Sequence, residues 1–112
     1  MSRYLISFDD GSIEIPDDEL AEVADAAHGV VAEAQAAGAW VFGGGVARQQ
    51  SSIVDPDGTV GAGPDPETKA VIGGFVIVDA SSREEAHRWA AKFARACRCA
   101  QEVREIMDDP LV

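Results

Sequence analysis

The chain has 112 residues, 46% of them hydrophobic and 26% charged, which is typical of one globular domain spanning residues 1–112. Nine Lys and Arg against twenty Asp and Glu give a formal net charge of −11, which would repel nucleic-acid phosphates and anionic membranes. We therefore expect neither nucleic acid nor a membrane surface as a partner.

The N-terminal part of the sequence predicts a strand and then a helix. Tyr4 to Phe8 is aromatic and branched, and Asp9-Asp10-Gly11 closes it as a turn. Pro16 is followed by three acidic residues, and both features favour a helix N-terminus there. Apolar residues then recur at three- and four-residue steps as far as Ala34, and Gly38 is a natural C-terminal cap.

The middle of the chain predicts short strands and a turn. Ala39 to Phe42 is an apolar run that Gly43-Gly44-Gly45 breaks, and Ser52 to Val54 is a weaker strand. The turn that follows, Asp55 to Gly58, has proline second and glycine fourth, which fits a type I turn. These features predict a small hairpin or arm.

A strand, a helix and a last strand complete the prediction. Phe75 to Val78 has no polar interruption, which favours a central strand buried on both faces. Ser82 and Glu85 have the spacing of a capping box, so a second helix begins at Ser82 with an apolar stripe that ends at Cys97. Gln101 to Met107 alternates polar with apolar residues and predicts the final strand.

This order predicts an α+β fold, the ferredoxin-like plait (βαββαβ with a small extra hairpin), an antiparallel sheet with two helices on one face. Such a fold leaves the other sheet face bare. Leu5 points away from the face that Tyr4 and Ile6 supply, and the Phe75 run is apolar on both sides. We therefore expect a homodimer formed through the open sheet face.

Several features indicate no metal and no cofactor. Cys97 and Cys99 form a lone C-x-C, which offers two ligands where zinc needs three or four, so we interpret them as reduced structural thiols. Gly43-Gly44-Gly45 is not followed by the Lys-Ser/Thr of a phosphate-binding loop.

The N-terminus lacks a secretory signal, and no run reaches the roughly 18 apolar residues of a membrane span, so we expect a cytoplasmic protein.

One long stretch resembles a known family. Residues 63–86, GPDPETKAVIGGFVIVDASSREEA, resemble the DGPF-type branch of the YCII-related family, and AAGAWVFGGGV and EVREIM are similar to its second and closing strands. The resemblance implies a dimeric α+β barrel. Where the family has Asp-Gly-Pro-Phe, this chain has Ala62 and Asp65 in place of the signature Asp and Phe, so the role of that Asp is not carried over.

The loop in this stretch contains candidate site residues. Glu67 and Lys69 are two apart, which puts both side chains on one face of an extended segment, with Thr68 between them as a binding candidate. A carboxylate beside an ammonium group can move a proton if burial shifts one pKa toward neutral. The alternative is an exposed ion pair that only steadies the loop.

His28 and Arg104 are the remaining candidates. His28 lies at the edge of the first helix's apolar stripe, and an imidazole can exchange a proton near neutral pH. The resemblance implies a helix histidine paired with an aspartate in some members, but this sequence shows no aspartate opposite His28. Arg104 matches the family's last strand. For His28, the alternative to a catalytic role is a partly exposed histidine at the helix edge with no role in chemistry.

Two hypotheses about function follow. In the first, a cleft between sheet and helices, lined by His28, Glu67, Lys69 and Arg104, binds or turns over a small polar or aromatic-derived metabolite by acid–base chemistry. In the second, the chain is a non-catalytic dimerisation or accessory module. An enzyme needs a concave pocket with an ionisable group in it, and a module does not.

Overall fold

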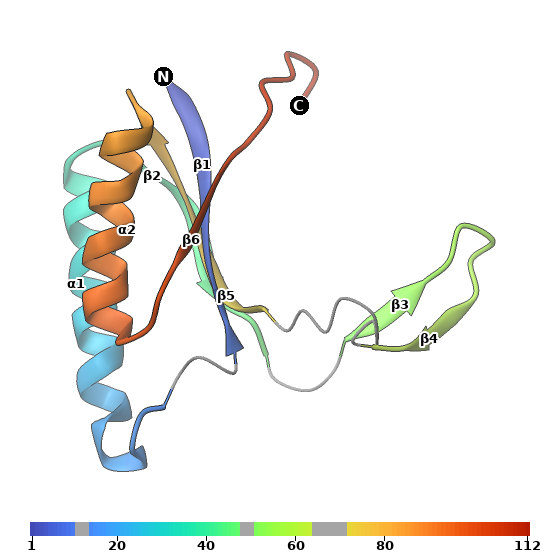
Figure 1. Cartoon of the computed structure of the whole chain (residues 1–112), viewed down its shortest axis with the longest axis horizontal. Coiled ribbons are helices and arrows are strands. Elements are labelled where there is room, and N and C mark those ends of the chain that lie inside the picture. The colour runs from blue at the N-terminus through green and yellow to red at the C-terminus, as the bar shows by residue number, and fades with distance from the viewer. Residues whose placement is uncertain (11–13, 48–50, 64–71) are drawn as a thin grey trace.

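The computed structural model describes residues 1–10, 14–47, 51–63 and 72–112. In chain order the elements are β1 (Ser2–Asp9), the 3₁₀ turn η2 (Asp17–Glu19), α1 (Leu20–Ala36), β2 (Trp40–Gly45), β3 (Ser52–Val54), β4 (Val60–Ala62), β5 (Ile72–Ala80), α2 (Arg83–Cys97) and β6 (Glu102–Glu105). Figure 1 shows both helices on one side of the main sheet and the β3–β4 hairpin on the other side. The predicted α+β fold is confirmed.

The main sheet has four strands in the order β2-β5-β1-β6, and each neighbouring pair is antiparallel. In the chain, α1 connects β1 to β2 and α2 connects β5 to β6, which makes this the ferredoxin-like plait. The extra hairpin β3–β4 is inserted between β2 and β5 as a separate two-stranded sheet. The predicted topology is therefore confirmed.

The core lies between the helices and one sheet face. One buried cluster joins β1, β5 and α2, and it consists of Tyr4, Ile6, Val78, Ala80, Ala86 and Ala90. A second cluster, Val30, Phe93 and Ala96, joins α1 to α2. Phe75 and Ile77 alternate with the buried residues of β5, so they lie half-buried on the open face. The prediction that this run is buried on both faces is wrong for the single chain, because helices cover only one face.

The end of α1 and the start of α2 lie where the sequence predicts them. Gly38 has φ +72°, the left-handed conformation that ends a helix, and its N–H donates to the Gln35 carbonyl at 3.1 Å. At the start of α2 the Glu85 N–H donates to Ser82 Oγ at 3.1 Å. The returning bond differs from a capping box by one residue, because Glu85 Oε2 accepts from the N–H of Ser81 at 2.6 Å.

This cap predicts a pH-dependent contribution to stability. Hydrogen bonds from the hydroxyl and the N–H of Ser81 lower the pKa of Glu85 below its ordinary value of 4.5. A carboxyl group whose pKa is lower in the folded state stabilises the fold fully at pH values above its unfolded-state pKa. This stabilisation is lost as the pH falls through the folded-state pKa. We expect Glu85→Gln to lower the melting temperature at pH 7, and the difference from wild type to shrink as the pH falls below 4.5 through the folded-state pKa.

Thermal unfolding between pH 3 and pH 7 measures this difference. Glu84→Gln is the matched control, because Glu84 also lies in the first turn of α2 and loses the same charge near the helix N-terminus. An equal pH dependence in the two variants would show that the bonds to Ser81 contribute nothing specific.

The strand boundaries differ from the prediction in two places. β2 continues through Gly45 because its backbone pairs with β5 as far as Gly74, whereas the sequence predicts a break at Gly43. β6 is shorter than the predicted Gln101 to Met107. The hairpin turn is confirmed, since the Gly58 N–H donates to the Asp55 carbonyl at 2.8 Å.

Candidate functional site

A hollow lies between the helices and the sheet, with a volume of about 470 Å³. Its walls include the aromatic side chains of Phe8, Trp40 and Phe93, and its polar side chains are those of His28, Cys97 and Gln101. We refer to it as the His28 hollow. Pockets of this size, mostly apolar with a few polar groups, are typical of small-molecule sites.

The helical repeat of α1 places His28 at the rim of the hollow. Ala24, His28 and Val31 all line it, and they lie four and three residues apart, so they share one face of the helix. His28 itself is exposed, whereas Val30 beside it is buried in the core. This arrangement confirms that His28 lies at the edge of the apolar stripe and faces the space between helix and sheet.

The edge strand approaches its neighbour closely beside the hollow. Gly43 lines the hollow, and a Cβ there would come within 2.6 Å of the Phe75 carbonyl oxygen and 2.8 Å of Val76 Cα. Both obstructing atoms belong to the backbone of β5. A side chain at this position would therefore force β2 away from the sheet.

Sequence reasoning missed Cys97 and Gln101 as lining residues. Burial raises the pKa of the Cys97 thiol, with a smaller contribution from Cys99, so this thiol stays protonated at neutral pH. Gln101 Nε2 lies 3.5 Å from both the carbonyl oxygen and Sγ of Cys99, the outer limit of hydrogen bonding. Among the residues that the structure describes, the hollow thus offers an imidazole, a neutral thiol and an amide, but no thiolate nucleophile.

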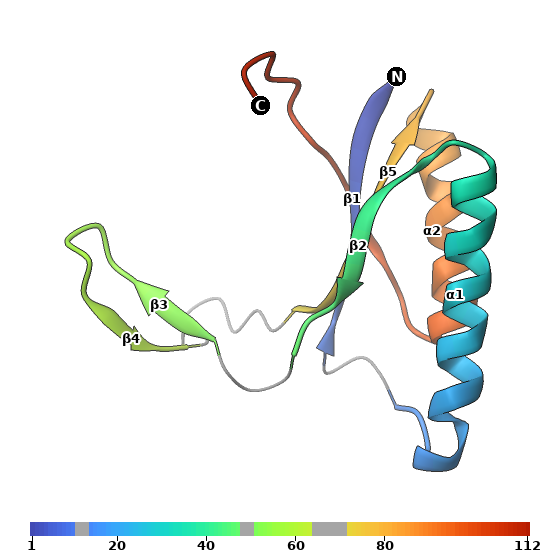
Figure 2. The ribbon, with the colours of Figure 1, turned by 180° about the vertical axis from the view of Figure 1, so that it is seen from behind.

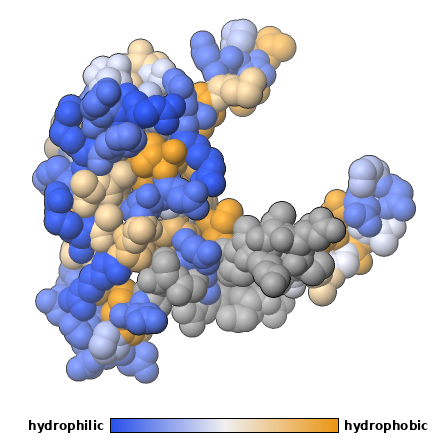
Figure 3. Space-filling view, in the orientation of Figure 1, coloured by the Kyte–Doolittle hydropathy of each residue, from blue (hydrophilic) through white to orange (hydrophobic). Residues whose placement is uncertain are grey.

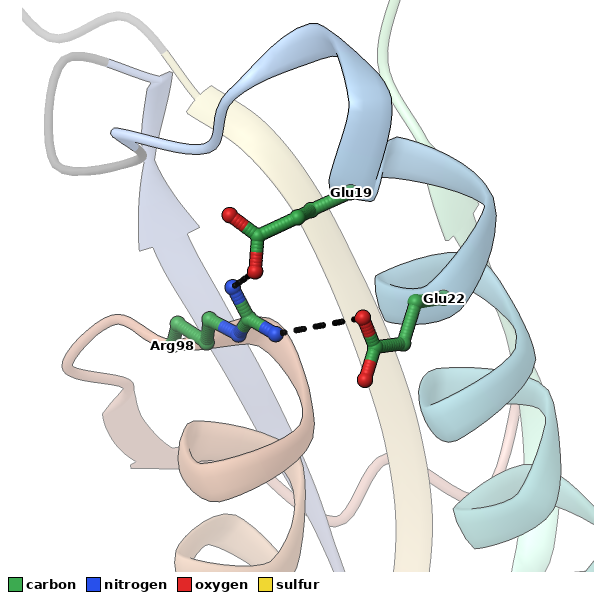
Figure 4. Close-up of polar contacts among 3 residues, drawn as sticks. All are labelled: Glu19, Glu22 and Arg98. Atoms are coloured by element: carbon green, nitrogen blue, oxygen red, sulfur yellow. Dashed lines mark hydrogen bonds and ion pairs between the residues drawn. The ribbon is translucent and has the colours of Figure 1, made fainter.

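Arg98 joins the two helices where α2 ends. It has φ 58°, a left-handed conformation that is unusual for a residue other than glycine, and it caps α2 directly after Cys97. Its Nη1 lies 2.9 Å from Glu19 Oε1 and its Nη2 3.9 Å from Glu22 Oε2, as Figure 4 shows. The hydrogen bond to Glu19 is the main cause that raises the pKa of Arg98. The contact links the end of α2 to the start of α1.

Arg104 lies on the opposite face of the sheet from His28. It is paired in register with Leu5, and residues opposite one another on antiparallel strands share a face. There it lines a separate hollow with Leu5 and Phe75, and its Nη2 lies 2.8 Å from Glu102 Oε2. The expectation of one cleft that contains both His28 and Arg104 is therefore wrong, because the sheet lies between them.

The loop candidates Glu67, Thr68 and Lys69 lie outside the described residues, and their roles stay predictions. Within the part of the chain that the structure describes, no group of three or more His, Cys, Asp or Glu side chains could hold a metal ion. None of the described helices is long and apolar enough to cross a membrane.

Comparison with known proteins gives a family and a likeness to solved structures. No curated protein matches the chain. Among solved structures, 5-chloro-2-hydroxyhydroquinone dehydrochlorinase (TftG) from Burkholderia phenoliruptrix AC1100, in complex with 2,5-dihydroxybenzoquinone, is similar at 21% identity over 96% of this chain and 95% of that chain, with a TM-score of 0.49. The family model described as the YCII-related domain matches residues 4–109, nearly the whole chain. The chain therefore belongs to the YCII-related domain family.

Proposed function

We propose that this protein binds a small aromatic-derived metabolite in the His28 hollow and that His28 accepts or donates a proton there. The observation that carries the proposal is the meeting of an imidazole with the rings of Phe8, Trp40 and Phe93 around one cavity of about 470 Å³. Aromatic walls favour a flat apolar ligand, and an imidazole can form a hydrogen bond with a hydroxyl group on it.

The arrangement limits the chemistry. No Asp or Glu is among the described residues that line this hollow, so a histidine–carboxylate pair is not part of the proposal. The protonated Cys97 thiol and the Gln101 amide can contact a ligand without forming a bond to it. The supported reaction class is proton transfer to or from a bound hydroxyl or an adjacent carbon, with His28 as the acid–base group.

The experiment uses two tryptophans as internal reporters. Trp40 lines the hollow, whereas Trp89 packs against the core clusters of α2. We expect phenol or catechol, added up to millimolar concentration, to shift the indole N–H NMR signal of Trp40 saturably and to leave that of Trp89 unchanged. Cyclohexanol is the non-aromatic control, and Trp89→Phe assigns the two signals.

Substitution of the histidine tests its role in the same titration. We expect His28→Gln to weaken binding about three- to tenfold, which corresponds to one neutral hydrogen bond. His87→Gln is the matched control, because His87 is exposed on α2 and does not line the hollow. If neither Trp signal moves with any probe, the ligand-binding proposal fails and the accessory-module hypothesis is favoured.

The proposal includes a homodimer formed through the open sheet face. Phe42 is 63% exposed there and pairs in register with the half-buried Ile77, which pairs in turn with Leu5. These side chains form an apolar row across β2, β5 and β1. A second copy would remove this row from water. The general rule that large exposed apolar patches mark protein interfaces supports this part of the proposal.

A further inference from the structure

The β3–β4 hairpin, which we call the arm, stands away from the rest of the chain. Figures 1 and 2, which are opposite views, both place it on the side of the main sheet away from the helices. The radius of gyration is 15.5 Å, whereas a compact chain of this length has about 13 Å. The arm therefore extends the chain away from the described core of helices and main sheet.

The arm exposes apolar side chains in pairs. Val54 and Val60 are opposite each other in register, so they lie on the same face, and they are 64% and 66% exposed. An isolated two-stranded hairpin is at best marginally stable in water and needs packing against another surface. This face of the arm requires a covering surface that the described residues of the single chain do not supply.

The C-terminal segment beyond β6, residues 106–112, projects from the same side of the sheet. Ile106 continues the pairing, its N–H donating to the Arg3 carbonyl at 2.8 Å, but Met107, Leu111 and Val112 are 89%, 94% and 105% exposed. Figure 3 shows an open concavity between this tail and the arm, with the open sheet face at its base. The two projections thus border the surface through which we propose dimerisation.

We propose that the arm of each subunit packs against a second copy of this chain, on the side of its open sheet face, and that the tail borders the same interface. The inference rests on the proposed dimer and adds the arm to it. In a twofold dimer each contact occurs twice, so both arms are covered at once. A second copy therefore supplies the surface that Val54 and Val60 lack.

The area of the sheet supports a contribution from the arm. The four strands have eight, nine, six and four residues. At a rise of about 3.3 Å per residue and a strand spacing of about 4.8 Å, the sheet covers only about 400 Å² in plan. A standard interface buries about 800 Å² per partner. Even with the relief of its side chains, the sheet alone is at the small end of stable interfaces.

The charged residues at the two surfaces allow contacts between the acidic turn of the arm and arginines of the sheet face. The arm's turn contains Asp55 and Asp57, and the described residues of the arm, 51–63, include no Lys or Arg. The open sheet face contains Arg3 and Arg104, whose side chains are 59% and 57% exposed. Although each arginine has an acidic partner within its own chain, it remains accessible to a carboxylate from a second copy. Because Asp79 and Glu102 lie on the same face and balance these two arginines, the choice of a second copy as occupant rests on the exposed apolar residues and on the area of the sheet.

Sedimentation velocity over a range of concentrations tests the inference with three variants that each add one negative charge. Val60→Glu alters the arm, Phe42→Glu alters the open sheet face, and Leu20→Glu alters an exposed residue at the start of α1, on the helix side. We expect a wild-type dimer, an increase in its dissociation constant of at least about tenfold for Val60→Glu and Phe42→Glu, and a change below about twofold for Leu20→Glu.

The outcomes separate the two proposals. If Phe42→Glu dissociates the dimer but Val60→Glu behaves like Leu20→Glu, the sheet dimer stands and the role of the arm is overturned. A wild-type monomer at about 100 µM overturns both the dimer and the arm, whereas the phenol titration of the His28 hollow remains an independent measurement. Hydrogen exchange gives a second readout, because the amides of the arm should be protected only at concentrations where the dimer forms.

Discussion

Gly43→Ala is expected to destabilise the fold by about 3 kcal/mol, the upper part of the range for inserting a methyl group into a filled space. The added Cβ would lie 2.6 Å from the Phe75 carbonyl oxygen and 2.8 Å from Val76 Cα. These are backbone atoms of β5, which also pairs with β1, so they cannot move without disturbing a second pair of strands. The melting temperature should fall on the order of 10 °C.

Gly44→Ala is the control in the next residue of the same strand. A Cβ at Gly44 meets no atom within 4 Å, and Gly44 is not in the left-handed region. We expect it to be neutral or to stabilise the fold by about 0.5 kcal/mol, because alanine restricts the unfolded chain. Thermal unfolding of the two variants under one condition measures the difference. Equal stability would contradict the close approach of β2 to β5 beside the His28 hollow.

Local signals in the sequence were sufficient to predict most of the fold. Hydrogen bonds between near neighbours end α1 at Gly38, begin α2 at Ser82 and close the hairpin turn at Asp55. Such bonds depend on a few consecutive residues, so they can be inferred without knowing the tertiary structure. The alternation of Tyr4, Leu5 and Ile6 between the two sheet faces belongs to the same class of signal.

The errors arose where a distant segment decides the outcome. Gly43 to Gly45 have low intrinsic preference for a strand, yet pairing with β5 holds them in one. Likewise, nothing in the sequence fixes the register that places Arg104 opposite Leu5, and that register determines on which face of the sheet Arg104 lies. Local patterns cannot supply this information.

The candidate site was predicted in part for the same reason. His28 could be found because it lies at the edge of an apolar helical stripe. Trp40 and Cys97 resemble ordinary core residues in their own segments, and only the packing of α1 and α2 on β2 brings them together at one hollow. Their role as lining residues is a property of the tertiary structure.

Ile6→Ala is the substitution for which we expect the largest loss of stability, about 3 to 4 kcal/mol. Ile6 has no exposed surface, and it lies on the central strand β1 within the main core cluster. Removal of its side chain leaves a cavity between the sheet and α2 that neighbouring side chains fill only partly. Because this loss occurs within each chain, the drop in melting temperature should be similar at all protein concentrations.

Leu5→Ala gives the informative comparison, because Leu5 is the preceding residue on the same strand but lies half-buried on the open face. If a second copy covers that face, the loss should be small at low concentration and should appear mainly as a lower melting temperature where wild type is dimeric, since association stabilises by mass action. Differential scanning calorimetry at two concentrations about a hundredfold apart measures both variants. If the change in melting temperature caused by Leu5→Ala is the same at both concentrations, Leu5 stabilises only the single chain. That result would argue against the open sheet face as an interface.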